Sequence, residues 1–149
     1  MIFKIEGLNV GIANDHAGYD LKVFLAGFLK DNGFSVYDYG CYNSSSVDYP
    51  DFAHALASHV NNGTVDWGIS ICGSGNGINM TVNKHALIRA ALCWNTEIAE
   101  LARLHNDANI CSLPARFITN EQAMEIITAF MQTDFEGGRH SVRVAKIPL

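Results

Sequence analysis

Residues 67–78 have the sequence Trp-Gly-Ile-Ser-Ile-Cys-Gly-Ser-Gly-Asn-Gly-Ile, which joins a short apolar run to a glycine-rich turn. Residues 67–72 form the kind of short apolar run that is typical of a buried strand, and a helical segment follows the glycines. A glycine-rich turn between a strand and a helix lets successive backbone N–H groups converge on an anion. The stretch therefore predicts a strand–turn–helix unit whose turn could hold an oxyanion or a phosphate.

The glycine turn does not match either of two familiar nucleotide-binding motifs. The dinucleotide fingerprint G-x-G-x-x-G would need a glycine where Ile78 stands, and the G-K-[ST] element of a P-loop is absent. A purely structural tight turn is an equal alternative at this point. Cys72 likewise has two interpretations, because it could be a small buried hydrophobe or a thiol that the helix N-terminus turns toward thiolate.

The same alternation of strand and helix extends on both sides of this unit. Short apolar runs predict four further strands, at residues 8–13, 34–39, 88–93 and 108–113.

Helices are predicted after each strand. Between residues 21 and 29 the apolar side chains have the spacing of one helix face, and another helix begins near Pro50. Asn95 is a plausible N-cap for the helix after residue 93, and Thr119 with Gln122 forms a capping box for the last regular helix.

Five such units predict an α/β protein with a three-layer α/β/α, Rossmann-like fold. We expect a five-stranded, mainly parallel sheet in a single domain over residues 1–149, with a C-terminal helical tail. Ligands of such sheets gather at the carboxyl ends of the strands, so the loops after residues 13, 72, 93 and 113 are the expected location of the chemistry. In the tail, Arg139 and Arg143 share one face if the segment is helical.

Composition narrows the class of partner. The 149 residues carry a formal net charge of −5, and no basic run suggests nucleic-acid binding. No apolar run approaches the ~18 residues of a membrane span, and no targeting segment is recognisable, so we expect a cytoplasmic protein. The four cysteines, at positions 41, 72, 93 and 111, show neither disulfide nor zinc spacing, so no metal site is expected.

Other polar residues occur where a site is expected, although each has an ordinary structural explanation. Asp15 and His16 follow the first strand, where Asp commonly caps a helix. His105 ends the fourth helix, where the helix dipole favours a histidine, and Arg116 follows the fifth strand. All five arginines lie in residues 84–149, the half of the chain with no net charge.

Taken together, these segments resemble the ribose-5-phosphate isomerase B family, which includes galactose- and allose-6-phosphate isomerases. The matching stretches occur in the family's order along essentially the whole chain. They are DHAG at 15–18, DYPDFA at 48–53, GISICGSGNGI at 68–78, NK at 83–84, ARLHNDAN at 102–109 and FEGGRHSVRV at 135–144.

The resemblance implies interconversion of an aldose phosphate and a ketose phosphate through an enediolate, without metal or cofactor. Cys72 would be the base that removes the C–H proton. The backbone N–H groups of residues 73–77 and the Ser74 hydroxyl would stabilise the enediolate oxygen. His105 would open the cyclic sugar.

The resemblance also implies which residues hold the substrate. Asp15 and Asn106 would contact sugar hydroxyls, and the glycine turn would lie against the substrate. The phosphate would be held by His16, Arg116, Arg139 and Arg143. The members of the turn are Gly73, Ser74, Gly75, Asn76 and Gly77.

Two departures from the family pattern bear on this site, because Pro114 stands where relatives usually have glycine and Asn79 where a small or apolar residue is usual. The first affects the placement of Arg116, and the second affects the start of the helix. The resemblance further implies a homodimer or homotetramer with shared active sites.

Three functions remain open. The first is isomerisation of ribose 5-phosphate and ribulose 5-phosphate with Cys72 as the base, which accords with a chain that retains every element of the site. A hexose-6-phosphate isomerase, acting on allose or galactose 6-phosphate, differs in how far the arginines stand from Cys72. A non-catalytic flavodoxin-like module that binds phosphate or a nucleotide would explain the glycine turn, but not a thiol, a helix-end histidine and paired arginines together.

Overall fold

The computed structural model describes residues 7–149, which contain one five-stranded sheet. The strands are β1 (Asn9–Asn14), β2 (Ser35–Asp38), β3 (Trp67–Cys72), β4 (Ala90–Leu92) and β5 (Ile110–Pro114). Their spatial order is β2-β1-β3-β5-β4, and every neighbouring pair is parallel. The predicted parallel sheet is confirmed, and β3 occupies the predicted residues, whereas the other strands differ at their ends by one or two residues.

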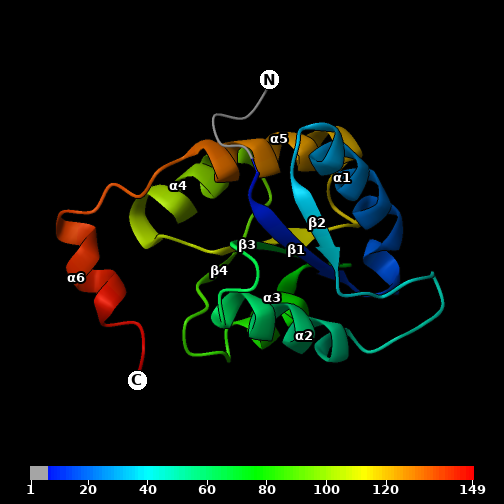
Figure 1. The fold of residues 1–149 in the computed structure, drawn as a ribbon, viewed down its shortest axis with the longest axis horizontal. Coiled ribbons are helices and arrows are strands. Elements are labelled where there is room, and N and C mark those ends of the chain that lie inside the picture. The colour runs from blue at the N-terminus through cyan, green and yellow to red at the C-terminus, as the bar shows by residue number, and fades with distance from the viewer. Residues whose placement is uncertain (1–6) are drawn as a thin grey trace.

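Helices cover both faces of the sheet, as Figure 1 shows. One face carries α1 (Tyr19–Asp31), α4 (Thr96–Asn106) and α5 (Asn120–Gln132), and the other carries α2 (Tyr49–Asn61) and α3 (Asn76–Val82). This arrangement confirms the three-layer α/β/α prediction. A short 3-10 helix, η1 (His16–Gly18), links β1 to α1.

The local signals in the sequence account for where helices begin. The Asn95 side chain accepts the backbone N–H of Ile98 at 2.9 Å and so caps α4. At the start of α5, Thr119 and Gln122 form both hydrogen bonds of the capping box, at 3.1 and 2.8 Å. These bonds satisfy N–H groups that have no partner inside the helix.

Strand alternation divides the core into two apolar clusters, one on each side of the sheet. In β3, Ile69 and Ile71 belong to the cluster beneath α1, α4 and α5, whereas Cys72 belongs to the cluster beneath α2 and α3. The end of β3 therefore turns the thiol toward the side on which the glycine turn and α3 follow.

The last helix, α6 (Arg139–Ala145), projects away from the layered body at the left of Figure 1. It is tied to α4 near its start, where the backbone N–H of Glu136 donates to the carbonyl of Leu104 at 3.0 Å. Several of its residues are exposed, including the apolar Val142. The predicted helical tail is thus confirmed. Among residues 7–149, no helix has the length and apolar character that crossing a membrane requires.

Candidate active site

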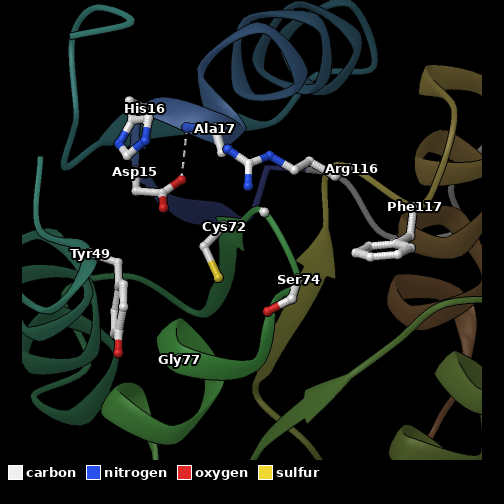
Figure 2. A pocket seen from close by; sticks show the side chains of 10 residues that line it. Asp15, His16, Ala17, Tyr49, Cys72, Ser74, Gly77, Arg116 and Phe117 are labelled. Atoms are coloured by element: carbon white, nitrogen blue, oxygen red, sulfur yellow. Dashed lines mark hydrogen bonds between the residues drawn. The ribbon is translucent and has the colours of Figure 1, made fainter. Parts of the chain in front are cut away.

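A cavity of about 550 Å³ opens at the carboxyl ends of β1, β3 and β5 (Figure 2). Cys72, the last residue of β3, contributes its thiol and is only 4% exposed. Figure 2 shows the Cys72 sulfur, the Asp15 carboxylate and the Ser74 hydroxyl directed toward one space. We call this cavity the Cys72 pocket; it is lined by Asp15, His16, Ala17, Tyr49, Cys72, Gly73, Ser74, Gly77, Arg116 and Phe117.

Asp15 and His16 enter the pocket from the end of β1. Asp15 is 7% exposed, and its Oδ1 accepts the backbone N–H groups of Ala17 at 3.0 Å and Gly18 at 3.2 Å. This cap fixes one carboxylate oxygen and leaves the other for a ligand. The Nδ1 of His16 accepts the N–H of Val47 at 3.2 Å, so a neutral His16 carries its proton on Nε2 and can donate it.

Arg116 reaches the same pocket from the loop after β5. Its backbone N–H donates to the carbonyl of Gly73 at 3.0 Å, and the next residue back, Ala115, donates to the carbonyl of Cys72 at 2.9 Å. Pro114 lies opposite Cys72 at the end of β5. A proline fits there because it has no N–H to donate, and the hydrogen bond to the Cys72 carbonyl comes from Ala115 instead. The unusual proline therefore leaves Arg116 lining the pocket.

The glycine turn contributes only part of its length to the pocket wall. Gly73, Ser74 and Gly77 line it, whereas Asn76 is exposed elsewhere and Gly75 packs inward. Gly75 has φ +76°, a left-handed conformation that favours glycine, and a Cβ there would lie 2.4 Å from the Leu92 side chain. The structure thus places Gly75 and Asn76 away from the cavity.

Tyr49 and Phe117 line the pocket and were not among the residues singled out from the sequence. Tyr49 belongs to the matching stretch at 48–53, which was the available signal, whereas nothing in the sequence marked Phe117. The Tyr49 ring packs so closely on Gly77 that a Cβ at that position would lie 2.4 Å from Cζ. Phe117 is 74% exposed at the rim.

Asn79 also fits without disturbing the helix that it enters. Its backbone N–H donates to the carbonyl of Gly75 at 3.1 Å, and α3 begins at Asn76 as a regular helix. Its side-chain Oδ1 is buried and has no hydrogen-bond partner among the described residues.

His105 and Asn106 lie at the opposite edge of the sheet from Cys72. They close the last turn of α4, a helix that starts beyond the carboxyl end of β4 and returns to the amino end of β5. In a parallel sheet the carboxyl and amino ends form opposite edges, and neither residue lines the Cys72 pocket. A single chain therefore does not bring the thiol and His105 together.

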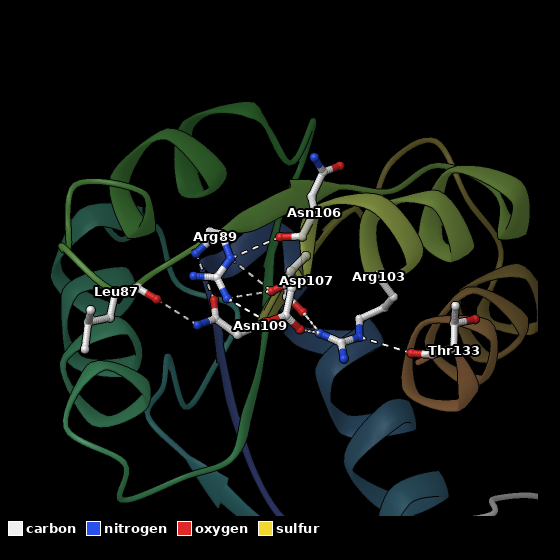
Figure 3. A network of polar contacts seen from close by, with 8 residues as sticks. Leu87, Arg89, Arg103, Asn106, Asp107, Asn109 and Thr133 are labelled. Atoms are coloured by element: carbon white, nitrogen blue, oxygen red, sulfur yellow. Dashed lines mark hydrogen bonds and ion pairs between the residues drawn. The ribbon is translucent and has the colours of Figure 1, made fainter. Parts of the chain in front are cut away.

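A network of polar contacts holds the end of α4 (Figure 3). Asp107, in a left-handed conformation with φ +48°, accepts from Arg103 at 3.0 Å and from Arg89 at 3.2 Å. Arg89 also donates to the carbonyl of Asn106 at 3.0 Å, so the backbone next to His105 is fixed by charge-assisted bonds. Burial lowers the pKa of Arg103, and Asp107 opposes that shift.

Arg139 and Arg143 lie on α6, close to His105 and likewise outside the Cys72 pocket. The His105 ring stacks on that of His140, with centroids 4.2 Å apart, and both approach Glu136. We call His105, Glu136 and His140, with Arg139 and Arg143, the His105 cluster.

The five arginines form two groups that differ in their partners. Arg89 and Arg103 pair with Asp107 and belong to the fixed network. No carboxylate among residues 7–149 pairs with the other three, which are Arg116, Arg139 and Arg143. An arginine without a carboxylate partner is available to an anionic ligand, and the bidentate geometry of its guanidinium suits a phosphate.

The fold, the Cys72 pocket and the His105 cluster define an α/β enzyme. Its polar groups suit acid–base chemistry on a phosphorylated small molecule. The comparisons with known proteins agree. Residues 10–147 match the family model described as Ribose/Galactose Isomerase. The ribose-5-phosphate isomerase B of Escherichia coli is 41% identical over 133 residues, which cover 89% of each chain.

Solved structures extend the match to the backbone. That of Clostridium thermocellum ribose-5-phosphate isomerase B has a TM-score of 0.93 and 46% identity, covering 94% of this chain and 95% of the other. That of the Mycoplasma genitalium enzyme with bound ribulose 5-phosphate has a TM-score of 0.91 and 41% identity, with 96% and 95% coverage. The chain belongs to the ribose/galactose isomerase family and is a sugar-phosphate isomerase.

Proposed function

We propose that this chain interconverts ribose 5-phosphate and ribulose 5-phosphate, with Cys72 as the base. The observation that carries the proposal is the Cys72 pocket, where a nearly buried thiol lies beside a capped carboxylate and an arginine without a carboxylate partner. The bound ribulose 5-phosphate of the Mycoplasma genitalium relative supports the choice of sugar.

The proposed reaction moves one proton between neighbouring carbons. The Cys72 thiolate takes the proton from C2 of the open-chain aldose, and the C2–H electrons form the enediolate double bond as the carbonyl oxygen becomes an oxyanion. A second proton passes from the C2 hydroxyl to the oxygen on C1, and the same thiol returns its proton to C1 as the C2 oxygen becomes the ketone carbonyl. Ser74 and the backbone N–H of Gly77, a first-turn group with no acceptor within the helix, both line the pocket and would stabilise the oxyanion.

We further propose that two copies of the chain complete each other's sites. Ring opening by His105 and phosphate binding by Arg139 and Arg143 need these groups near Cys72, but they lie outside its pocket in one chain. A second copy that places its α4 end and α6 over the pocket would supply them, with Asn106 contacting a sugar hydroxyl. The exposed Phe117 at the pocket rim and Val142 on α6 offer apolar surface for that contact.

Proton exchange tests the reaction. We expect incubation with ribose 5-phosphate in heavy water to place deuterium at C2, as followed by NMR, and Cys72→Ala to abolish the exchange. The same assay with allose 6-phosphate and galactose 6-phosphate shows whether the enzyme acts instead on hexoses. Absence of exchange with every sugar phosphate would refute an isomerase with this site.

Mixing two inactive variants tests the sharing of sites. Cys72→Ala and His105→Asn chains, unfolded and refolded together, form mixed dimers in which one of the two sites has both Cys72 and His105. We expect equal amounts to recover about a quarter of the wild-type activity, because half of the dimers are mixed and each has one intact site. If each chain held a complete site, mixing would recover nothing.

A further inference from the structure

The His105 cluster contains two residues, His140 and Glu136, that the proposed reaction leaves without a role. The rings of His105 and His140 are nearly parallel, with an interplanar angle of 12° and centroids 4.2 Å apart. Their Nε2 atoms lie 3.9 and 3.7 Å from the same Oε2 of Glu136. Two histidines from different helices therefore stack on each other beside a single carboxylate oxygen.

The two rings differ sharply in exposure. His140 is 6% exposed, and its Nε2 is buried without a hydrogen-bond partner among the described residues. The His105 side chain keeps 36% of its surface accessible. His140 thus forms a fixed support on one face of the His105 ring, while His105 remains open to a ligand.

Burial and the surrounding charges favour the neutral form of His140. Burial lowers its pKa, positive charge on His105, Arg139 and Arg143 lowers it further, and only Glu136 acts in the opposite direction. A protonated His105 would therefore stack on an uncharged ring. This arrangement avoids the repulsion that two stacked imidazolium ions would experience.

The same geometry argues against a divalent cation between these three residues. The lone pair of an imidazole nitrogen lies in the ring plane, and two nearly parallel rings cannot both direct it at one ion between them. Arg139 and Arg143 add positive charge at the same place. The cluster is better suited to orienting an imidazole than to holding a metal.

We propose that His140 is a positioning residue that fixes the ring of His105 for opening the cyclic sugar. The stack sets the plane of the His105 ring, and the Glu136 carboxylate lies 3.9 Å from its Nε2. This inference rests on the proposed role of His105. Misplacing a reacting group by about 1 Å can cost ~100-fold in rate, so loss of the support has a large expected effect.

The reaction offers a readout that separates positioning from folding. Ribose 5-phosphate is mainly a cyclic hemiacetal closed through its C4 hydroxyl, whereas 4-deoxyribose 5-phosphate lacks that hydroxyl and stays open-chain. We expect His140→Ala to lower kcat/KM for ribose 5-phosphate by about 10- to 100-fold. For 4-deoxyribose 5-phosphate we expect a change of less than about threefold, because that substrate needs no ring opening.

Two further variants define what the stack contributes. His140→Phe keeps an aromatic ring against His105 and should restore most of the activity toward ribose 5-phosphate. His85→Phe is the matched control, because His85 also pairs with a histidine, His54, but lies outside both the Cys72 pocket and the His105 cluster. It should leave the activity toward both substrates unchanged.

A titration of the imidazole signals by NMR tests the inference without substrate. We expect His140→Ala to shift the His105 ring-proton resonances and the midpoint of their titration, and His85→Phe to leave them in place. Unchanged His105 signals, equal losses on the cyclic and the open-chain substrate, or a His140→Phe variant as impaired as His140→Ala would each overturn the positioning role. Failure of the proposed function would look different, since His105→Asn would then show no selective loss on the cyclic sugar.

Discussion

The Cys72 pocket and the His105 cluster are built in opposite ways. The pocket lies at the ends of three hydrogen-bonded strands, and two of its side chains, Cys72 and Asp15, are almost completely buried. The cluster lies where α4 ends and the seven-residue α6 begins, and the side chains of His105 and Glu136 are substantially exposed.

This difference matches the demands of the two tasks. Proton transfer at carbon requires a group held within tenths of an ångström, which a sheet edge provides. Binding a phosphate tolerates more movement, because a guanidinium attracts an anion over several ångströms. The Cys72 pocket, which we call the rigid half of the site, therefore carries the proposed chemistry at carbon. The His105 cluster, which we call the projecting half, carries the charges that would capture the substrate.

The largest effect is expected from Cys72→Ala in the rigid half. Removing the proposed base should lower kcat/KM by about 1000-fold, within the range typical of general acid–base groups. Cys111→Ala is the matched control: Cys111 is also fully buried on a central strand, but burial and the neighbouring Cys93 raise the pKa of its thiol, which stays protonated. Substantial activity in the Cys72 variant would assign the proton transfer to another group.

Two arginine substitutions should affect different measured quantities, one substrate binding and the other stability. Arg143→Ala should raise KM by roughly 10-fold or more through loss of a charge-assisted hydrogen bond, with little change in Tm. Arg103→Ala should instead lower stability by about 2 kcal/mol, since Arg103 pairs with Asp107 and stacks 4.4 Å over the Trp67 ring. Steady-state kinetics and thermal unfolding measure the two effects, and a Tm loss in both variants would contradict the distinction.

The sequence could predict the rigid half because its signals are local. The apolar run 67–72, the glycines at 73–77 and the caps at Asn95 and Thr119 each specify a conformation within a few residues. Together with the rule that ligands gather at carboxyl strand ends, they placed Asp15, His16, Cys72 and Arg116 in one pocket.

The projecting half could be predicted less completely because its contacts join distant segments. The stack of His105 on His140 depends on how α6 folds back on α4, which no local pattern encodes. Phe117 lines the pocket because of the path that the loop after β5 takes, and this path is likewise not encoded by a local pattern. The family resemblance supplied the residues His105, Arg139 and Arg143, but not their position at the other edge of the sheet.

Two glycine substitutions test how tightly the pocket is packed. Gly77→Ala would place a methyl group 2.4 Å from the Tyr49 ring and should displace it, with an expected loss of kcat/KM of about 10-fold. Gly27→Ala is a matched control within a helix, because no atom lies within 4 Å of a Cβ there, and it should raise stability by about 0.5–1 kcal/mol. Full activity of Gly77→Ala would show that the pocket wall is adaptable.

The smallest expected effect is a loss of stability at acidic pH that His140, in the projecting half, should cause. The pKa of His140 in the folded chain is lowered from 6.5, so between that lowered pKa and pH 6.5 the unfolded chain binds a proton that the folded chain does not. The contribution of neutral His140 to stability is therefore complete above pH 6.5 and is lost as the pH falls toward its folded pKa. Denaturant unfolding of wild type and His140→Phe at pH 7.5 and pH 5.5 measures this contribution. The free energies of unfolding of the two proteins should differ less at pH 5.5 than at pH 7.5.

His85 provides the comparison within the layered body, because burial and His54 lower its pKa in the same direction. His85→Phe should remove a separate part of the acid dependence while leaving the His105 resonances unchanged. If the stability of wild type and His140→Phe fell in parallel between the two pH values, His140 would be protonated equally in the folded and unfolded chains. The neutral support for His105 would then be absent, and exposure rather than charge would have to distinguish the two stacked rings.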